Sequence, residues 1–200
     1  MNPSVTSAPG TYPVSLAEVR QQLAIETQYW DARLAGLVAA ATAHIETLTG
    51  RALITRSYRG FLNWWPLDSR TNAVKRYIAL EKPPLISVTS LTTYDDSDNA
   101  TVMSPSLYFV DTASTIGRIV LRRGVVWPMF PTALRVANGI QIDWTAGYGP
   151  NPSDVPEEIR LAVLMMVGVF NEQRGDETAP PLTPPAVMHL LPPNIMPASA

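Results

Sequence analysis

The chain has 200 residues, enough for one medium domain or one domain with extended arms and too few for a large multidomain protein. Its 15 Lys and Arg and 17 Asp and Glu give a net charge of −2, which excludes the overall basic field of a protein that holds nucleic acid through phosphate contacts. The absence of Cys excludes disulfides, thiolate nucleophiles and Cys-based zinc sites.

The first segment, residues 1–14, is rich in Pro, Ser, Thr and Gly and is predicted to form an extended N-terminal arm. Ser15 and Glu18 fit a capping box, in which the hydroxyl accepts from the third helical N–H and the carboxylate reaches back to the cap. This motif predicts a short helix over about residues 15–26.

A second, longer helix is predicted over about residues 28–49, where apolar residues recur at spacings of three and four. Gly50 follows at the position where a left-handed residue commonly ends a helix. The pattern then changes to short alternating segments and turns, which predicts an antiparallel β subdomain over about residues 54–145. The strands with the clearest signals are 87–94, 116–121 and 140–144.

The acidic segment Asp95–Asn99 lies inside this β block and has two interpretations. Its oxygen-rich side chains are those of a calcium loop, but it lacks the central Gly and the distal Glu that a helix–loop–helix calcium site requires. A hairpin tip stabilised by Asx turns is the favoured interpretation.

A third helix is predicted over about residues 155–173, where Pro156 and two following Glu residues suit a helix N-terminus. This helix is apolar on most sides, so it must be covered either by the bundle or by a neighbouring subunit. The predicted fold class is α+β: a small bundle of three main helices with an inserted antiparallel β subdomain and extended N- and C-terminal arms. The side chains predicted to pack between subunits are Leu161, Leu164, Val167, Phe170, Trp64 and Trp65.

The C-terminal segment, residues 178–200, has no charged side chain and contains seven Pro in 23 residues. So many prolines predict an extended arm, partly polyproline II, without a helix. The arm also carries more apolar side chains than a solvated linker needs, which predicts that it docks on another molecule. The predicted anchors are Leu182, Met188, Leu190, Leu191 and Ile195.

The sequence offers no catalytic constellation. His44 falls within the second helix without an orienting carboxylate on its face, and His189 lies in the proline-rich arm, so both are interpreted as non-catalytic. No phosphate loop, nucleophile elbow or zinc-protease motif occurs, and no cofactor or metal is expected. There is also neither a secretory signal nor a long apolar run, so we expect cytoplasmic assembly and no membrane partner.

Two further sets of residues each have two interpretations. The five Trp residues suit either packing in the core and at subunit interfaces, which is favoured, or stacking against a sugar or a base. Arg118, Arg122 and Arg123 form a compact basic patch, which is interpreted either as a solvated strand end or as a contact with passing DNA or an acidic neighbouring subunit.

Several segments in a fixed order resemble a known family. They are the end of the second helix with Gly50 and Arg51, Lys82-Pro-Pro-Leu85 with Val88-Thr-Ser-Leu91, and Asp143-Trp-Thr-Ala-Gly-Tyr-Gly149 running into Val155-Pro-Glu-Glu-Ile-Arg160. Over about residues 14–175 the chain resembles the head–tail connector (adaptor, or head-completion) proteins of long-tailed bacteriophages and phage-derived gene transfer agents.

This resemblance implies a connector domain over residues 15–177 and a structural role without enzyme activity. It implies a ring, typically of twelve copies, that lies at the neck of a virion or phage-like particle, is bound to the portal protein, and extends the channel through which double-stranded DNA passes. It also implies a stopper or tail terminator as the next partner. Portal binding by the C-terminal anchors is a separate hypothesis, which depends on the uncharged, apolar and proline-rich character of that segment. The proline-rich C-terminus departs from the family pattern.

Three other functions compete with this one, of which a hydrolase that uses paired Asp and Glu residues has no supporting motif. The chain could be another neck component, a stopper or a tail-completion protein, although such rings are mostly β and this sequence is partly helical. It could also be a carbohydrate- or nucleic-acid-binding module that uses its Trp residues, and would then be a monomer whose fluorescence responds to ligand.

Overall fold

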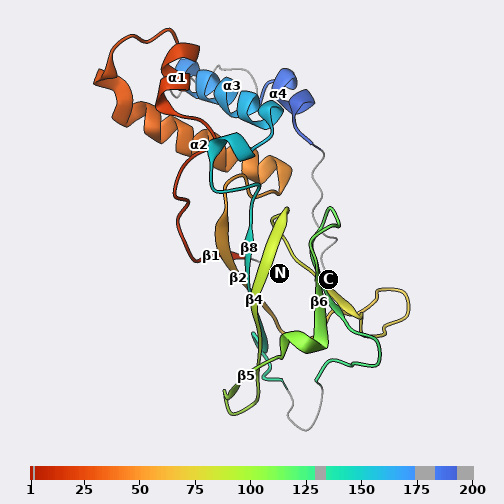
Figure 1. The fold of residues 1–200 in the computed structure, drawn as a ribbon. Coiled ribbons are helices and arrows are strands. Elements are labelled where there is room, and N and C mark those ends of the chain that lie inside the picture. The colour runs from red at the N-terminus through yellow and green to blue at the C-terminus, as the bar shows by residue number, and fades with distance from the viewer. Residues whose placement is uncertain (2, 129–133, 174–182, 193–200) are drawn as a thin grey trace. The chain divides into compact units, whose positions relative to one another are not determined.

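The computed structural model describes residues 1, 3–128, 134–173 and 183–192. The chain divides into two compact units. Among the described residues, the helical unit comprises 9–54, 148–173 and 183–192, and the β unit comprises 1, 3–8, 55–128 and 134–147. Most of the β unit, residues 55–147, is therefore inserted between two segments of the helical unit. The predicted α+β class is confirmed (Figure 1).

The helical unit begins with the predicted capping box. The Ser15 hydroxyl accepts from the backbone N–H of Glu18 at 3.2 Å, and the Glu18 carboxylate accepts from the backbone N–H of Ser15 at 2.7 Å. The left-handed cap at Gly50, with φ 67°, is also confirmed. The helices of this unit are α1 (Leu16–Gln22), η1 (Gln28–Trp30), α2 (Asp31–Thr49), η3 (Pro152–Asp154), α3 (Glu157–Gln173) and α4 (Pro185–Leu190).

Helix α1 ends four residues before the predicted boundary. Ala24 adopts a left-handed conformation with φ 53°, and its N–H donates to the carbonyl of Gln21. The N–H of Ile25 donates to the carbonyl of Arg20, which completes a Schellman motif. Because this motif usually requires Gly at the left-handed position, an Ala there gave the sequence no signal that the helix stops.

Packing of α2 against α3 forms the core of the helical unit. Three polar side chains of α2 are buried here: the hydroxyls of Thr42 and Thr49 donate to backbone carbonyls one turn earlier in α2. The third, Glu46, accepts from the backbone N–H of Leu53 at 3.0 Å, which ties α2 to the segment that follows it. A buried carboxylate is tolerated because it is hydrogen-bonded. The fully buried apolar side chains include Leu34, Val38, Ala41, Ile45, Ile159, Val163, Met166 and Val167.

The prediction that the C-terminal arm contains no helix is wrong. Helix α4 begins at Pro185 and places Val187 in the core of the helical unit, with no exposed surface. Proline is excluded from a helix interior but fits its first turn, where the N–H has no partner in any case. Two prolines in sequence, Pro184 and Pro185, therefore mark a helix start here.

The β unit contains two antiparallel sheets among its described residues. The larger has the strand order β1-β2-β8-β4-β5 and the smaller β3-β7-β6. The strands are β1 (Ser4–Val5), β2 (Arg56–Leu62), β3 (Tyr77–Ala79), β4 (Leu85–Tyr94), β5 (Ala100–Val102), β6 (Tyr108–Asp111), β7 (Arg118–Leu121) and β8 (Ile140–Ala146), with a 3-10 turn, η2 (Pro105–Leu107), before β6.

The N-terminal arm is not free along its length. Ser4 and Val5 form an edge strand on β2, and the N–H of Thr6 donates to the carbonyl of Ser57 at 2.9 Å. The N-terminal ammonium lies 3.2 Å from the Glu81 carboxylate. The arm is extended as predicted, but its first residues are held by the chain's own sheet.

The core of the β unit follows from the alternation in β8. Ile140, Ile142 and Trp144 are buried, while the residues between them are half-buried. Trp65 and Trp127 stack with ring centroids 4.5 Å apart and are both buried. The favoured interpretation of the Trp residues as packing residues is confirmed for these three.

Candidate functional site

A groove of about 330 Å³ opens on the helical unit between α1, α3 and α4. Two of its carboxylates come from the start of α3, where acidic residues are favoured by the helix dipole. Three carboxylates and one guanidinium line the groove, so its lining is acidic as well as apolar. The lining residues are Glu18, Glu157, Glu158, Arg160, Leu161, Leu164 and Leu190.

Arg160 engages two of these carboxylates. Its Nη1 lies 2.5 Å from Glu157, its Nη2 bonds Glu18, and its Nε donates to the carbonyl of Pro13 at 3.0 Å. The hydrogen bond from the Ser15 backbone N–H, with help from the Ser15 hydroxyl and Arg160, holds the pKa of Glu18 below its ordinary value despite the opposing effect of burial.

Glu158 differs from the other two acids of the groove. It is exposed, and its carboxylate makes no hydrogen bond or ion pair with any residue that the structure describes. Next to it Leu161 is 44% exposed, although it is a large apolar residue on a packed helix. We call this surface the acidic groove. It presents to solvent the carboxylate of Glu158, which has no partner among the described residues, and the exposed apolar side chain of Leu161.

The three-stranded sheet of the β unit presents a second unusual surface. Val120 is the register partner of both Tyr77 and Phe109, so these three side chains share one face of the sheet. Ile78 and Ile119, one position along, are buried on the other face. Tyr77 and Phe109 are both exposed, which leaves an aromatic row open to solvent.

Two basic side chains, Lys75 and Arg118, lie over the Tyr77 ring of this row. The guanidinium of Arg118 lies 5.5 Å from the Tyr77 ring centroid and 2.6 Å from the Asp111 carboxylate. The hydrogen bonds from Ser114 and Arg118 lower the pKa of Asp111 to about 2. Arg118 is therefore paired within its own subunit, which argues against the predicted role of this residue as a contact to DNA or to a neighbour.

The segment after β7, residues 122–126, carries the unpaired part of the basic patch. Arg122 and Arg123 are exposed, and within the described part of the chain their guanidinium groups have no hydrogen-bond or ion-pair partner. Arg76, which the sequence did not single out, joins them, because its Nη2 donates to the carbonyl of Arg122 at 2.7 Å. Val126 is 79% exposed. We call residues 122–126 the basic loop.

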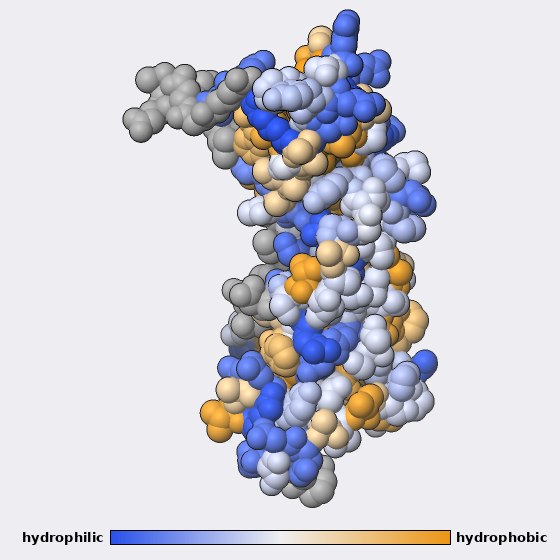
Figure 2. Space-filling view, turned by 90° about the vertical axis from the view of Figure 1, so that its left-hand side faces the viewer, coloured by the Kyte–Doolittle hydropathy of each residue, from blue (hydrophilic) through white to orange (hydrophobic). Residues whose placement is uncertain are grey.

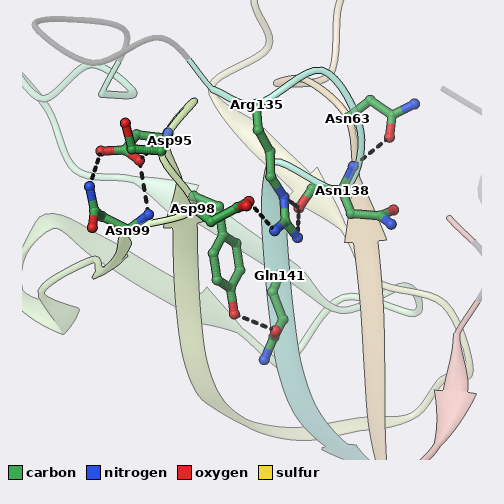
Figure 3. A network of polar contacts seen from close by, with 9 residues as sticks. Asn63, Asp95, Asp98, Asn99, Arg135, Asn138 and Gln141 are labelled. Atoms are coloured by element: carbon green, nitrogen blue, oxygen red, sulfur yellow. Dashed lines mark hydrogen bonds and ion pairs between the residues drawn. The ribbon is translucent and has the colours of Figure 1, made fainter.

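A third polar cluster stabilises the tip of the β4–β5 hairpin. The Asp95 carboxylate accepts from the backbone N–H groups of Ser97 and Asn99, both at 2.9 Å, which confirms the hairpin interpretation. Arg135 points from a neighbouring loop toward Asp98 and stacks 4.2 Å from the Tyr94 ring centroid (Figure 3). No group of three or more potential metal ligands occurs among the described residues.

Each unit exposes apolar side chains on its surface, which appear in one view as the orange patches of Figure 2. Large apolar residues that are exposed include Leu161 and Met188 on the helical unit and Phe109 and Val126 on the β unit. Large apolar side chains gathered on a surface commonly mark contacts with other proteins. No helix in the described part of the chain is both long and apolar enough to cross a bilayer.

The predicted subunit-contact residues divide into two groups. Val167 and Trp65 are buried inside their own units, because one packs in the α2–α3 core and the other stacks on Trp127. Neither is therefore available to a neighbouring subunit. The remaining predicted residues retain surface: Trp64 and Leu161 are exposed, and Leu164 and Phe170 are half-buried.

The predicted anchors of the C-terminal arm also differ among themselves. Met188 is 51% exposed, whereas Leu190 and Leu191 pack partly against the helical core. Leu182 and Ile195 lie outside the described residues. The Nε2 of His44 lies 2.7 Å from the Thr183 hydroxyl and so fastens the segment just before α4 to α2.

Comparison with known families matches residues 14–179 to the model of the head completion protein family. The chain belongs to the head completion protein family. The match spans elements of both units, so the head completion chain includes the β insertion as well as the helices. A search of curated proteins found no match.

Three solved structures contain chains similar to this head completion protein. A chain from a structure of the neck of an empty gene transfer agent (GTA) particle, computed with C6 symmetry, is 26% identical, with 99% of each chain covered and a TM-score of 0.76. One from the neck of a native GTA particle, computed with C12 symmetry, is 26% identical over 99% of each chain, with a TM-score of 0.73. One from the virion of a native GTA particle is 27% identical, covering 95% of this chain and 93% of that chain, with a TM-score of 0.74.

Proposed function

We propose that this chain is the head–tail connector subunit of a phage or a phage-like gene transfer agent. In this role it is structural and not catalytic, is assembled in the host cytoplasm, and lies at the neck of the particle between the portal and the stopper or tail terminator. The observation that carries the proposal is the similarity over 99% of both chains to proteins from GTA necks, together with the family match over residues 14–179.

Twelve copies forming a closed ring are the proposed assembly. The related necks were computed with C6 and C12 symmetry, and a ring of twelve is compatible with both. A ring requires two different surfaces on each subunit, because every copy meets its two neighbours through different faces. Exposed or half-buried apolar residues that remain candidates for these faces are Trp64, Leu161, Leu164 and Phe170.

The ring would extend the DNA channel without retaining the DNA. Each neutralised phosphate adds to the affinity of a protein for DNA, so a strongly basic ring would slow passage. A net charge of −2 per copy supports transient, non-specific passage of double-stranded DNA.

Attachment to the portal is proposed to use the C-terminal segment. Val187 holds α4 on the helical core, while Met188 on the same short helix faces outward. In this arrangement α4 is a fixed base from which apolar side chains reach a groove on the portal, with little ordering entropy left to lose on docking. The proposed anchors are Leu182, Met188, Leu190, Leu191 and Ile195.

Reconstitution tests this function. The purified chain is mixed with the portal ring of the same particle, and the complexes are imaged by electron microscopy and weighed by native mass spectrometry. We expect one closed ring of this chain on the tail-side face of each portal. A chain that ignores the portal but caps isolated tails would be a tail-completion protein, and a chain that binds neither would contradict the proposal.

A second arm of the experiment tests the anchors. Met188→Asp places a charge on an exposed position, so the subunit is expected to stay folded while portal binding weakens at least tenfold. His189→Asp, an exposed neighbour outside the anchor set, is the matched control and is expected to bind the portal as the wild type does. Equal binding by wild type and Met188→Asp would remove α4 from the portal contact.

A further inference from the structure

The acidic groove and the basic loop complement each other in both charge and apolar character. We propose that the acidic groove of one copy receives the basic loop of a second copy, and that this contact joins neighbouring subunits. The inference rests on the proposed ring and deepens it by naming the two surfaces that meet.

The groove has the chemistry of a receptor for a short basic and apolar segment. Its apolar residues, Leu161, Leu164 and Leu190, come from two helices, α3 and α4, and Leu161 retains almost half of its surface. Glu158 stands beside them without a partner in the described structure. Glu157, although paired with Arg160, still has a carboxylate side chain that is 80% exposed and can accept a second donor.

The loop has the matching chemistry. Arg122 and Arg123 have exposed guanidinium groups that find no partner among the described residues, and Val126, which follows them, is 79% exposed. Arg pairs with carboxylates through two parallel hydrogen bonds, so two arginines match the two carboxylates at the start of α3. The side chain of Val126 can cover the apolar surface that the leucines of the groove expose to solvent.

The two patches are different surfaces, which is what a heterologous contact requires. The groove lies on the helical unit and the loop on the β unit, so a copy that gives its loop to one neighbour still has its groove free for another. Contacts of this head-to-tail kind close into rings or extend into filaments, whereas a self-complementary contact stops at a dimer. The pairing is therefore of the type that a ring needs.

Passing DNA is the other binding partner that the arginines suggest, and the surroundings favour a protein. Arginine with exposed tyrosine and phenylalanine is the composition of protein interfaces, and here Tyr77 and Phe109 lie on the sheet that the loop leaves. An exposed valine gains nothing from a phosphate backbone. DNA binding by the loop also leaves the acidic groove without a function.

Charge exchange tests the inference. The groove variant carries Glu157→Arg and Glu158→Arg, and the loop variant carries Arg122→Glu and Arg123→Glu. All four side chains are exposed, so both variants are expected to fold, which circular dichroism checks. Each variant alone sets like charges against each other, and we expect its ring yield on the portal to fall at least tenfold.

Two rescues distinguish pairing from simple damage. A subunit that carries all four substitutions restores opposite charges at every contact and is expected to form rings at near wild-type yield. A mixture of equal amounts of the two variants is expected to form rings in which they alternate, because each groove then meets a loop of opposite charge. Native mass spectrometry tests this arrangement, because strict alternation requires equal numbers of the two variants in every ring.

Matched controls and the remaining outcomes complete the test. Glu172→Arg, an exposed acid on α3 outside the groove lining, and Arg70→Glu, an exposed base outside the loop, are expected to form rings normally. Full ring yield from either single variant, or no rescue by the four-fold variant, overturns the inference. If the loop variant forms rings but loses salt-sensitive binding of duplex DNA, the loop is a DNA contact instead. If the wild type itself forms no ring on the portal, the proposed function fails first, and the two failures are therefore distinguishable.

Discussion

Substitution of Val187 tests whether α4 belongs to the folded subunit. The side chain has no exposed surface and packs on the helical core. Val187→Ala removes two methyl groups, each worth about 0.8 kcal/mol of burial. The cavity left behind adds to this loss, so docking of α4 is expected to weaken by about 2 kcal/mol.

Hydrogen exchange of the peptide that covers α4 measures this loss directly. The N–H of Met188 donates to the carbonyl of Pro184, and the N–H of Leu191 donates to the carbonyl of Met188, so both are protected only while α4 is formed. A loss of about 2 kcal/mol corresponds to about 30-fold faster exchange. The same loss appears as a lower urea midpoint if α4 unfolds together with α2 and α3.

The matched control lies at the next position. Met188 is longer than Val187 but exposed, so Met188→Ala is expected to change the exchange of α4 by less than about threefold. Unchanged exchange in Val187→Ala, or an equal acceleration in both variants, would refute the reasoning that one residue of this helix is a core residue and its neighbour an anchor.

Three further predictions concern stability and pH. Trp65→Ala removes a buried, stacked ring and is expected to destabilise the β unit by about 3–5 kcal/mol. Trp64→Ala, at an exposed neighbouring position, is expected to cost less than about 1 kcal/mol. Chemical denaturation, followed by the fluorescence of the remaining Trp residues, measures both values. The pKa of Asp111 is lowered to about 2 from an ordinary 3.8, so its carboxylate stabilises the folded state above pH 3.8 and loses this effect as the pH falls toward 2. The difference in urea midpoint between wild type and Asp111→Asn should therefore be full near neutral pH and shrink between pH 3.8 and 2. A difference that stays constant with pH would contradict this prediction. Gly149→Ala would bring a Cβ within 2.3 Å of the Asp154 carboxylate and is expected to lower the free energy of unfolding by about 1–3 kcal/mol. Gly36→Ala meets nothing within 4 Å on an exposed helix face and is expected to raise the free energy of unfolding by about 0.5–1 kcal/mol. Thermal denaturation of the two variants side by side checks both predictions.

Local signals in the sequence were sufficient for several elements. The Ser15–Glu18 capping box, the left-handed Gly50 and the alternation through β8 all depend on residues within one turn or one strand of each other. Such signals predict where an element starts or which way its side chains face, and these predictions are confirmed. The fold class follows from them because the periodicity changes from helix to strand and back.

Features that depend on contacts between residues far apart in the sequence could not be predicted from the local sequence pattern. Tyr77 and Phe109 share a face only because both pair with Val120 in the smaller sheet. Arg76 joins the basic loop through a hydrogen bond that spans 46 positions. The acidic groove likewise combines residues of α1, α3 and α4, and none of these neighbourhoods follows from spacing along the chain.

The errors at α4 and at Val167 have a related cause. Proline content excludes a helix only as an average, and the position of Pro185 at the first turn reverses that conclusion. A helix that is apolar on most sides must be covered, but the sequence does not say by what. In this subunit α2 and the short helix α4 cover much of α3, so Val167 was already satisfied without a neighbour.

The two ends of the inserted segment, residues 55–147, lie close together. Arg56 and Ala146 are register partners in adjacent strands, and Ile54 bridges to Gly149. Partners of this kind have Cα atoms about 5 Å apart, a gap that a few residues of linker span. A short linker could therefore join the two ends of this segment without parting α2 from α3, whereas residues 4 and 5 would lose the strand with which they pair.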